Sequence, residues 1–137
     1  MTLTQRERDC LTIISEENGI KLARLSQRLK VKPPTAFMLV KRLIGMEAIR
    51  RDRNGLIVLT RRGENEAKRI KFKHRVMETL LSKNGVKIEE ACNECKKLDF
   101  LISYNVAMEI FKKMDKPSNC PHGKPIKALF AADVTKV

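Results

Sequence analysis

Apolar residues recur at intervals of three and four along most of the chain, which is the spacing of one face of an α-helix. The clearest rows are Leu22, Leu25 and Leu29; Val40, Leu43 and Ile44; Ile70, Met77 and Leu81; and Val106, Ile110, Phe111 and Met114. A further inward row is expected at Ile88, Ala91, Cys92, Cys95 and Leu98 or Asp99. These five rows, together with the local signals at the start of the chain, predict six helices, at about 4–18, 21–31, 34–49, 64–83, 88–98 and 103–116.

Local signals set the ends of these helices. Thr4 and Glu7 have the spacing of a capping box, in which each side chain bonds the backbone of the other residue. Asn18 followed by Gly19 is a typical helix end. The pair Pro33–Pro34 stops the second helix, and Pro34 can open the third, because proline fits the first helical turn.

A basic hairpin follows the third helix. Asn54–Gly55 is a strong turn signal between the basic run at 50–53 and the apolar run at 56–60. Three short helices and a basic hairpin follow the plan of a winged helix-turn-helix. We therefore expect a mainly α protein, with a winged helix-turn-helix domain at residues 1–63 and a second, α-helical domain at residues 64–137.

Charge is concentrated in the first half. The net charge is +13, and residues 1–75 hold 19 basic and 8 acidic side chains against 10 and 8 in the remainder. A basic half joined to a nearly neutral half indicates that one half meets a polyanion. The chain has no run of the roughly 18 apolar residues that a membrane span needs and no leader-like start, so we expect a soluble, cytoplasmic protein. In that setting four cysteines argue against a disulfide framework.

The third helix is the expected DNA-reading element, because the second helix of a helix-turn-helix lies in the major groove. Its first turns are poor in hydrogen-bonding side chains, so we expect readout to be partly apolar and shape-based. Any single basic residue here is more often a solvated surface charge, and the prediction rests on the whole set. The DNA-binding candidates are Lys32, Pro34, Thr35, Ala36, Met38, Lys41 and Arg42 of the helix, Arg51, Arg53 and Asn54 of the hairpin, and Arg61.

Metal-ligand residues gather in the second half. His74 and Glu78 are four residues apart and share a helix face, although a histidine on an apolar row is often only a core residue. Two further sources of ligands are the Cys92/Cys95 pair and the Cys-Pro-His segment at 120–122. One possible mixed site, suited to zinc or a similar ion, consists of His74, Glu78, Cys92, Cys120 and His122. The alternative, that the cysteines are small core residues, stays open, above all for Cys95.

Several segments resemble the diphtheria-toxin-repressor family of iron- and manganese-dependent transcriptional repressors. These segments are LTQRERDCLTIISEENG, PPTAFMLVKRL, GLIVLTRRGE, KHRVMETLL, LISYNV and CPHGKPI. The resemblance points to the short manganese-transport-regulator branch, which lacks a C-terminal SH3-like domain. It implies a homodimer that binds a palindromic operator on double-stranded DNA, and it makes residues 64–137 a metal-binding and dimerisation domain.

The resemblance divides the ligands between two sites. His74 and Glu78 match a histidine ligand of the family and its helical partner, whereas Lys96, Asp99 and Phe100 stand where the principal site is expected. That principal site therefore looks dismantled or rebuilt. We expect one zinc, iron or manganese ion at the other site, with a preference softer than that of manganese because of the thiolates. The secondary candidates for metal ligands are Asp9, Cys10, Cys95 and Asp99.

Three functional hypotheses follow. The first is a metal-responsive, DNA-binding transcriptional repressor, which is not an enzyme. The second is a constitutive or redox-responsive DNA-binding protein whose metal is structural or absent, and Lys96 and Phe100 motivate it. The third, a thiol oxidoreductase that uses Cys92 and Cys95, is disfavoured because no strand is predicted before the pair. The operator, the regulated genes and the effector ion do not follow from the sequence.

Overall fold

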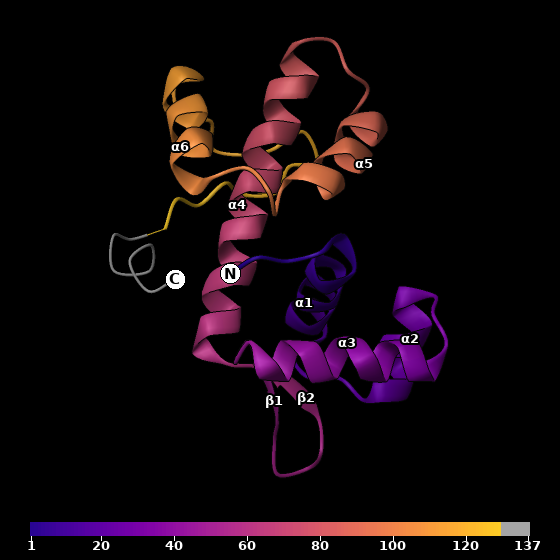
Figure 1. Ribbon diagram of the computed structural model, residues 1–137. Helices are drawn as coiled ribbons and strands as arrows, with labels where there is room; N and C mark the ends of the chain where they lie inside the picture. The colour runs from indigo at the N-terminus through magenta and orange to yellow at the C-terminus, as the bar shows by residue number, and fades with distance from the viewer. Residues whose placement is uncertain (130–137) are drawn as a thin grey trace. The chain divides into compact units, whose positions relative to one another are not determined.

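The computed structural model describes residues 1–129, which form six helices and one two-stranded sheet (Figure 1). The prediction of a mainly α protein is confirmed. The elements are α1 (Gln5–Glu17), α2 (Leu22–Leu29), α3 (Pro33–Gly45), β1 (Ile49–Arg51), β2 (Ile57–Leu59), α4 (Arg61–Lys83), α5 (Ile88–Leu98) and α6 (Tyr104–Lys113). None of these helices is long and apolar enough to cross a membrane.

The chain divides into two compact units. The first runs from Met1 to Ala67, and the second begins at Lys68. The predicted domain boundary between residues 63 and 64 lies close to this division and stays a prediction.

The first unit is built on locally determined helices. The Thr4 Oγ1 atom accepts a hydrogen bond from the Glu7 amide at 3.2 Å, and the Thr4 amide donates to Glu7 Oε1 at 2.9 Å, so the predicted capping box is present. Helix α1 ends where Asn18 takes a left-handed conformation, with φ of 54°. The three helices bury a common set of apolar side chains, among them Leu11, Ile14, Leu25, Val40 and Leu43.

Helix α3 is shorter than predicted. It ends at Gly45 rather than near residue 49, and Glu47 then takes a positive φ of 59° that turns the chain into β1. The predicted burial of Ile44 is wrong, because 43% of this side chain is exposed. Val40 and Leu43 occupy the buried face instead.

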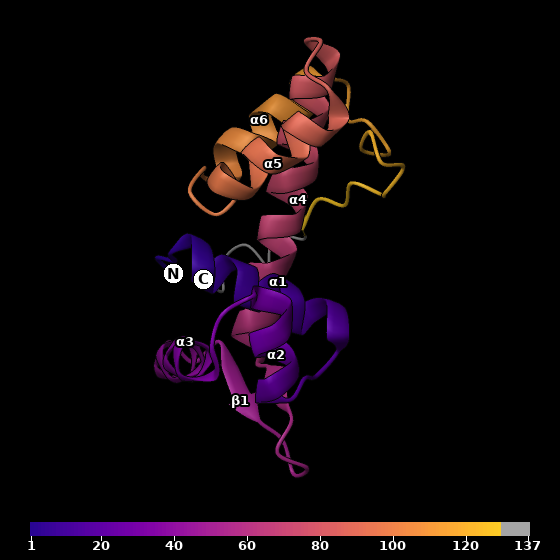
Figure 2. The same cartoon turned by 90° about the vertical axis from the view of Figure 1, so that its right-hand side faces the viewer.

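The basic hairpin is confirmed, with a longer loop than the Asn-Gly signal implied. Strands β1 and β2 are antiparallel, and Arg51 pairs with Ile57 across a five-residue connection. The Asp52 carboxylate closes this loop by accepting hydrogen bonds from the Asn54 and Leu56 amides at 2.8 and 2.9 Å. The hairpin extends beyond the helices of its own unit (Figure 2).

In the second unit, α5 and α6 lie on either side of the C-terminal part of α4 (Figure 1). Its core centres on Phe72, whose ring lies 5.1 Å from that of Tyr104 and 5.3 Å from that of Phe111. The predicted inward positions Ile88 and Val106 are wrong, since 41% and 51% of these residues are exposed. The remaining buried members of the core are Val76, Ala107, Cys120 and Ile126.

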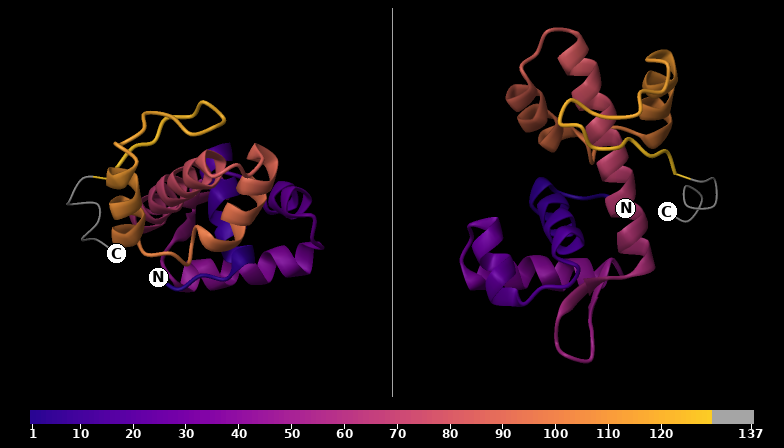
Figure 3. Two further views of the ribbon diagram at one scale, coloured as in Figure 1. Left: turned by 90° about the horizontal axis from the view of Figure 1, so that it is seen from above. Right: turned by 180° about the vertical axis from the view of Figure 1, so that it is seen from behind.

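The segment after α6 returns across α4 (Figure 3). The Arg75 guanidinium donates a hydrogen bond to the Pro125 carbonyl at 2.7 Å, which ties the segment to the helix. Ile126 is buried in the Phe72 core, with 8% of its surface exposed. These two anchors follow directly after the Cys-Pro-His segment and hold the chain there against α4 and the Phe72 core.

Candidate metal centre and candidate nucleic-acid interface

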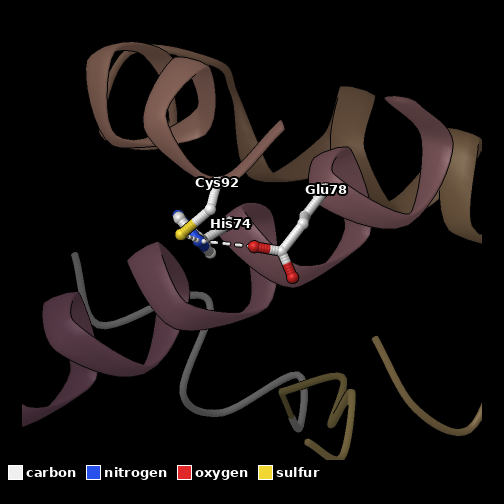
Figure 4. Close-up of side chains that lie close together, drawn as sticks. All are labelled: His74, Glu78 and Cys92. Atoms are coloured by element: carbon white, nitrogen blue, oxygen red, sulfur yellow. Dashed lines mark hydrogen bonds and ion pairs between the residues drawn. The ribbon is translucent and has the colours of Figure 1, made fainter. Parts of the chain in front are cut away.

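Helix α4 supplies the first two side chains of the candidate metal centre. His74 and Glu78 are one turn apart, and His74 Nε2 lies 3.2 Å from Glu78 Oε2. Helix α5 adds the Cys92 thiol, whose Sγ lies 3.6 Å from the same ring nitrogen (Figure 4). The predicted meeting of His74, Glu78 and Cys92 is therefore present in the fold.

Asp99 fixes the other side of the His74 ring. His74 Nδ1 lies 2.9 Å from Asp99 Oδ2, and the Asp99 side chain has no exposed surface. A carboxylate accepts hydrogen bonds, so Nδ1 carries the hydrogen. The other ring nitrogen, Nε2, faces the Glu78 carboxylate, and either a proton or a metal ion at this point would join the two groups.

The Cys-Pro-His segment supplies the second group of ligands. His122 Nδ1 lies 2.9 Å from Glu78 Oε1. The segment is a tight turn in which the Gly123 amide donates to the Cys120 carbonyl at 2.8 Å, and Gly123 has a φ of 79°. The turn places Cys120 inward, with 6% of its surface exposed, and leaves His122 at the surface.

Glu78 carries the negative charge of the site in a buried position. Its side chain is only 1% exposed. Burial acts to raise the pKa of Glu78, but the hydrogen bond from His122 and the charges of His74 and His122 outweigh it and lower the pKa below its usual value. Glu78 is therefore a carboxylate at neutral pH, which is the form that binds metal.

The donor atoms fit a divalent transition metal. Two sets of three residues bring one donor atom each to within 4.8 Å of one another: His74, Glu78 and Cys92, and Glu78, Cys120 and His122. Each set offers an imidazole nitrogen, a sulfur and a carboxylate oxygen, a mixture suited to zinc or iron. All five principal candidates from the sequence thus lie in these two sets.

The secondary candidates lie outside both sets. Burial, reinforced by nearby carboxylates, raises the pKa of Cys95 to about 12, and the same cause raises the pKa of Cys10 to about 12. Asp9 is paired with Arg8 at 3.1 Å. Asp99 contacts the site through His74 rather than through a donor atom of its own in either set. The role of Asp99 had no signal in the sequence pattern, because it depends on a contact across 25 positions.

Most of the candidate DNA-contacting residues are exposed. Those on α3 and just before it are Lys32, Pro34, Thr35, Met38, Lys41 and Arg42, and those on or after the hairpin are Arg51, Arg53, Asn54 and Arg61. The prediction that Ala36 contacts DNA is wrong, because its side chain is 0% exposed and packs in the core of the helices. Phe37 and Met38 are exposed by 49% and 58%. The exposed apolar surface expected on this helix therefore includes Phe37, which is not among the DNA-binding candidates predicted from the sequence.

The chain matches two family models. Residues 60–128 match the metal-binding and dimerisation domain of iron-dependent repressors, and residues 3–55 match the MarR family. The iron-dependent repressor IdeR of Mycobacterium leprae is 31% identical over 118 residues, which are 84% of this chain and 51% of that protein. IdeR of Mycobacterium tuberculosis is 31% identical over 124 residues, 87% of this chain and 53% of that protein. The chain therefore spans about half the length of these curated relatives.

Solved structures resemble most of the chain. A hypothetical protein from Sulfolobus solfataricus superposes with a TM-score of 0.78 at 28% identity, covering 92% of this chain and 100% of that one. The structure of ScaR with bound Zn²⁺ has a TM-score of 0.78 at 28% identity, over 89% of this chain and 59% of that one. The T. acidophilum IdeR structure has a TM-score of 0.72 at 27% identity, over 96% of this chain and 65% of that one.

Proposed function

Because the chain belongs to the iron-dependent repressor family, we propose that it is a metal-responsive transcriptional repressor that binds a palindromic DNA operator as a homodimer. The membership confirms the resemblance noted in the sequence. The proposal includes the soluble, cytoplasmic location that the sequence predicts.

The observation that carries the proposal is the arrangement around His74. Both ring nitrogens of this residue face carboxylates, Asp99 on one side and Glu78 on the other, and a thiol lies 3.6 Å from Nε2. A divalent ion at this point would supply the positive charge that the converging donors need. We propose that His74, Glu78 and Cys92 hold such an ion, with Cys120 and His122 adding ligands to the same centre. Zinc, iron and manganese are the candidate ions.

The DNA-binding part of the proposal rests on the first unit. Helix α3 presents an exposed face with Thr35, Met38 and Lys41, which is the face expected to enter the major groove. Arg53 at the tip of the hairpin is exposed and positioned to contact phosphates or the minor groove. Such contacts release counterions, so the binding should weaken as salt increases.

Metal and DNA binding would be linked through the dimer. A metal ion held by these residues would tie α5 and the Cys-Pro-His segment to α4 and so stabilise the unit that matches the dimerisation model. A dimer presents two copies of α3 to two operator half-sites, so an ion that favours the competent dimer also raises its affinity for DNA. The coupling expected for such linkage is about 1–3 kcal/mol, or roughly 5- to 150-fold in affinity.

The test uses the full chain with its metal removed and then restored. An operator is first selected from a random DNA library with metal-loaded protein, and its affinity is then measured by fluorescence anisotropy at fixed salt. We expect chelation to weaken binding and added zinc, iron(II) or manganese to restore it. Equal affinity with and without metal would refute the metal switch.

A second candidate function is a constitutive or redox-responsive DNA-binding protein. It is favoured by Lys96, which is exposed, and by Phe100, since neither side chain supplies an ordinary metal ligand at the expected principal site. A structural metal would be supported if zinc stayed bound during dialysis and the affinity for DNA did not change when metal was added. Affinity that changes only on thiol oxidation would support the redox version.

A further inference from the structure

The first turn of α1 places a buried carboxylate against α3. Glu7 is the third residue of α1, and only 1% of its side chain is exposed. Its Oε1 accepts a hydrogen bond from the Thr4 amide at 2.9 Å, whereas its Oε2 lies 3.2 Å from Arg42 Nε on α3. Glu7 therefore joins the beginning of α1 to the helix that is expected to enter the major groove.

Arg42 compensates the charge at the oxygen of Glu7 that the capping box does not use. Oε2 is buried and has no hydrogen-bond partner among the described residues, so its contact with Arg42 is an ion pair. Breaking an ion pair whose carboxylate is buried is costly, because the charge left behind has no water around it. The contact therefore holds the Nε edge of the Arg42 guanidinium beside α1.

The rest of the Arg42 side chain is accessible to a second partner. The side chain is 60% exposed, and the two terminal nitrogens of a guanidinium carry N–H donors of their own. Met38 precedes Arg42 by four positions on α3, so the two residues lie on the same side of the helix. Met38 is 58% exposed there. The accessible part of Arg42 is therefore next to the surface that is expected to meet DNA.

We propose that Arg42 binds a phosphate of the DNA backbone through its terminal nitrogens while Glu7 holds its Nε edge. Arg42 is then the contact with DNA, and Glu7 is a positioning residue that acts through Arg42. Arginine suits two partners at once, because its planar fork matches both carboxylate and phosphate, whereas the ammonium of lysine is a point charge. The inference rests on the proposed function in requiring that the chain binds DNA.

This arrangement predicts an effect of Glu7 opposite to that of its charge alone. Removing an acidic side chain from a basic, DNA-binding unit ordinarily strengthens DNA binding, because the phosphates are repelled less. Glu7→Gln should instead weaken DNA binding, because Arg42 loses the partner that orients it. Glutamine keeps an oxygen that can accept from the Thr4 amide, so the capping box is retained.

The experiment measures the DNA affinity of the full-length protein, with zinc added, over a range of salt concentrations. The probes are the operator selected from a random library and a duplex of random sequence. Arg42→Gln should weaken binding to both duplexes and reduce the slope of log affinity against log salt by about one. Glu7→Gln should weaken binding by about twofold or more, as expected for two residues in contact.

A double variant separates positioning from two independent effects. Glu7→Gln combined with Arg42→Gln should bind DNA about as weakly as Arg42→Gln alone, since both residues act through one contact. The double variant leaves no buried charge unpaired at this place, so it gives the salt slope even if Arg42→Gln does not fold. Lys41→Gln is the matched control, because Lys41 is exposed beside Arg42 and its effect should multiply with that of Glu7→Gln.

Three results would overturn the inference. If Glu7→Gln bound DNA as tightly as the wild type or more tightly, Glu7 would not position Arg42. If the double variant kept the wild-type salt slope, Arg42 would only brace α3 against α1. If the effects of Glu7→Gln and Arg42→Gln multiplied, the two residues would act separately. Each result leaves the proposed function standing as long as the wild type binds DNA, whereas a wild type that bound neither duplex would remove both proposals.

Discussion

Asp99 holds His74 through a contact of 2.9 Å between Oδ2 and Nδ1, made by a carboxylate that has no exposed surface. Asp99 caps the C-terminal end of α5, so the end of that helix sets the position of the carboxylate. The contact fixes the tautomer of His74 and turns Nε2 toward Glu78 and Cys92. In the family resemblance this position belonged to the principal metal site, but here the residue serves the histidine of the other site.

Replacing Asp99 with asparagine should weaken metal binding without removing a donor atom from either set. Partners of metal-bound histidines typically contribute about 10- to 100-fold in metal affinity, and Asp99→Asn keeps the shape while losing the charge. Zinc affinity measured by competition with a chromophoric chelator checks this. Glu94→Gln is the control, because Glu94 is 59% exposed on the same helix. An Asp99→Asn protein with wild-type zinc affinity would show that the contact is only structural.

The four cysteines should differ sharply in reactivity. Burial raises the pKa of Cys10 and of Cys95 to about 12, so at pH 8 only about one molecule in ten thousand carries the reactive thiolate at either position. Cys92 is half-buried beside His74 and should react first in the metal-free protein. A thiol-specific chromogenic reagent should therefore label Cys92 in the folded protein and all four cysteines only after denaturation.

Two further measurements make this result specific. Added zinc should slow the labelling of Cys92, and Cys92→Ser should remove the fast phase. Rapid labelling of Cys95 in the folded protein, identified by mass spectrometry, would contradict its burial. It would also revive the disfavoured hypothesis of a Cys92–Cys95 redox pair.

Features set by neighbouring residues were predictable from the sequence. The Thr4–Glu7 capping box is within one helical turn, and α5 was predicted with the bounds that it has, Ile88–Leu98. Burial was less predictable, because helical spacing defines a face without saying which neighbours cover it. Ile88 and Val106 fall on apolar rows and are nevertheless exposed, whereas Phe72, which lay on no predicted row, centres the core.

The same difference between local and long-range contacts applies to the candidate site. His74 and Glu78 could be paired from their spacing on one helix, and the helical face of Cys92 was visible in the pattern. The approach of His122 to Glu78 joins residues 44 positions apart, so the sequence could offer it only as one possible grouping of ligands, which the family resemblance then supported. Nothing in the sequence separated five ligands at one ion from two sets that share a carboxylate.

Met38 and Ala36 should respond differently to substitution, although both are at the start of α3. Met38 is 58% exposed, and its apolar side chain suits contact with thymine methyl groups. Met38→Ala should change the base preference of the protein, which sequencing of DNA selected from a random library measures. Ala36 is fully buried, so Ala36→Ser should lower the free energy of unfolding by about 1–3 kcal/mol and leave the base preference unchanged.

Arg53→Ala is the reference for contacts that carry no sequence information. It should weaken binding to all DNA sequences alike and reduce the slope of log affinity against log salt by about one. A changed base preference in Ala36→Ser, with none in Met38→Ala, would mean that α3 presents a different face to DNA.

In the metal-free protein, the free energy of unfolding should depend on pH through the Glu78 carboxylate. The pKa of Glu78 is lowered below its ordinary value of 4.5, since the hydrogen bond from His122 and the charges of His74 and His122 outweigh the effect of burial. A lowered pKa in the folded state means that ionised Glu78 stabilises the fold above pH 4.5. That stabilisation is lost as the pH falls through the folded-state value. Glu78→Gln removes the titrating group and should remove this pH dependence.

Urea unfolding at a fixed chain concentration, with chelator present, measures the effect between pH 3 and pH 7. The difference in free energy of unfolding between the wild type and Glu78→Gln should be largest above about pH 4.5 and shrink on acidification. Glu94→Gln is again the matched control, because its carboxylate is exposed and makes a surface contact with Lys97. A difference that grew on acidification would mean that burial raises the pKa of Glu78, and His122 would then not supply the compensating bond.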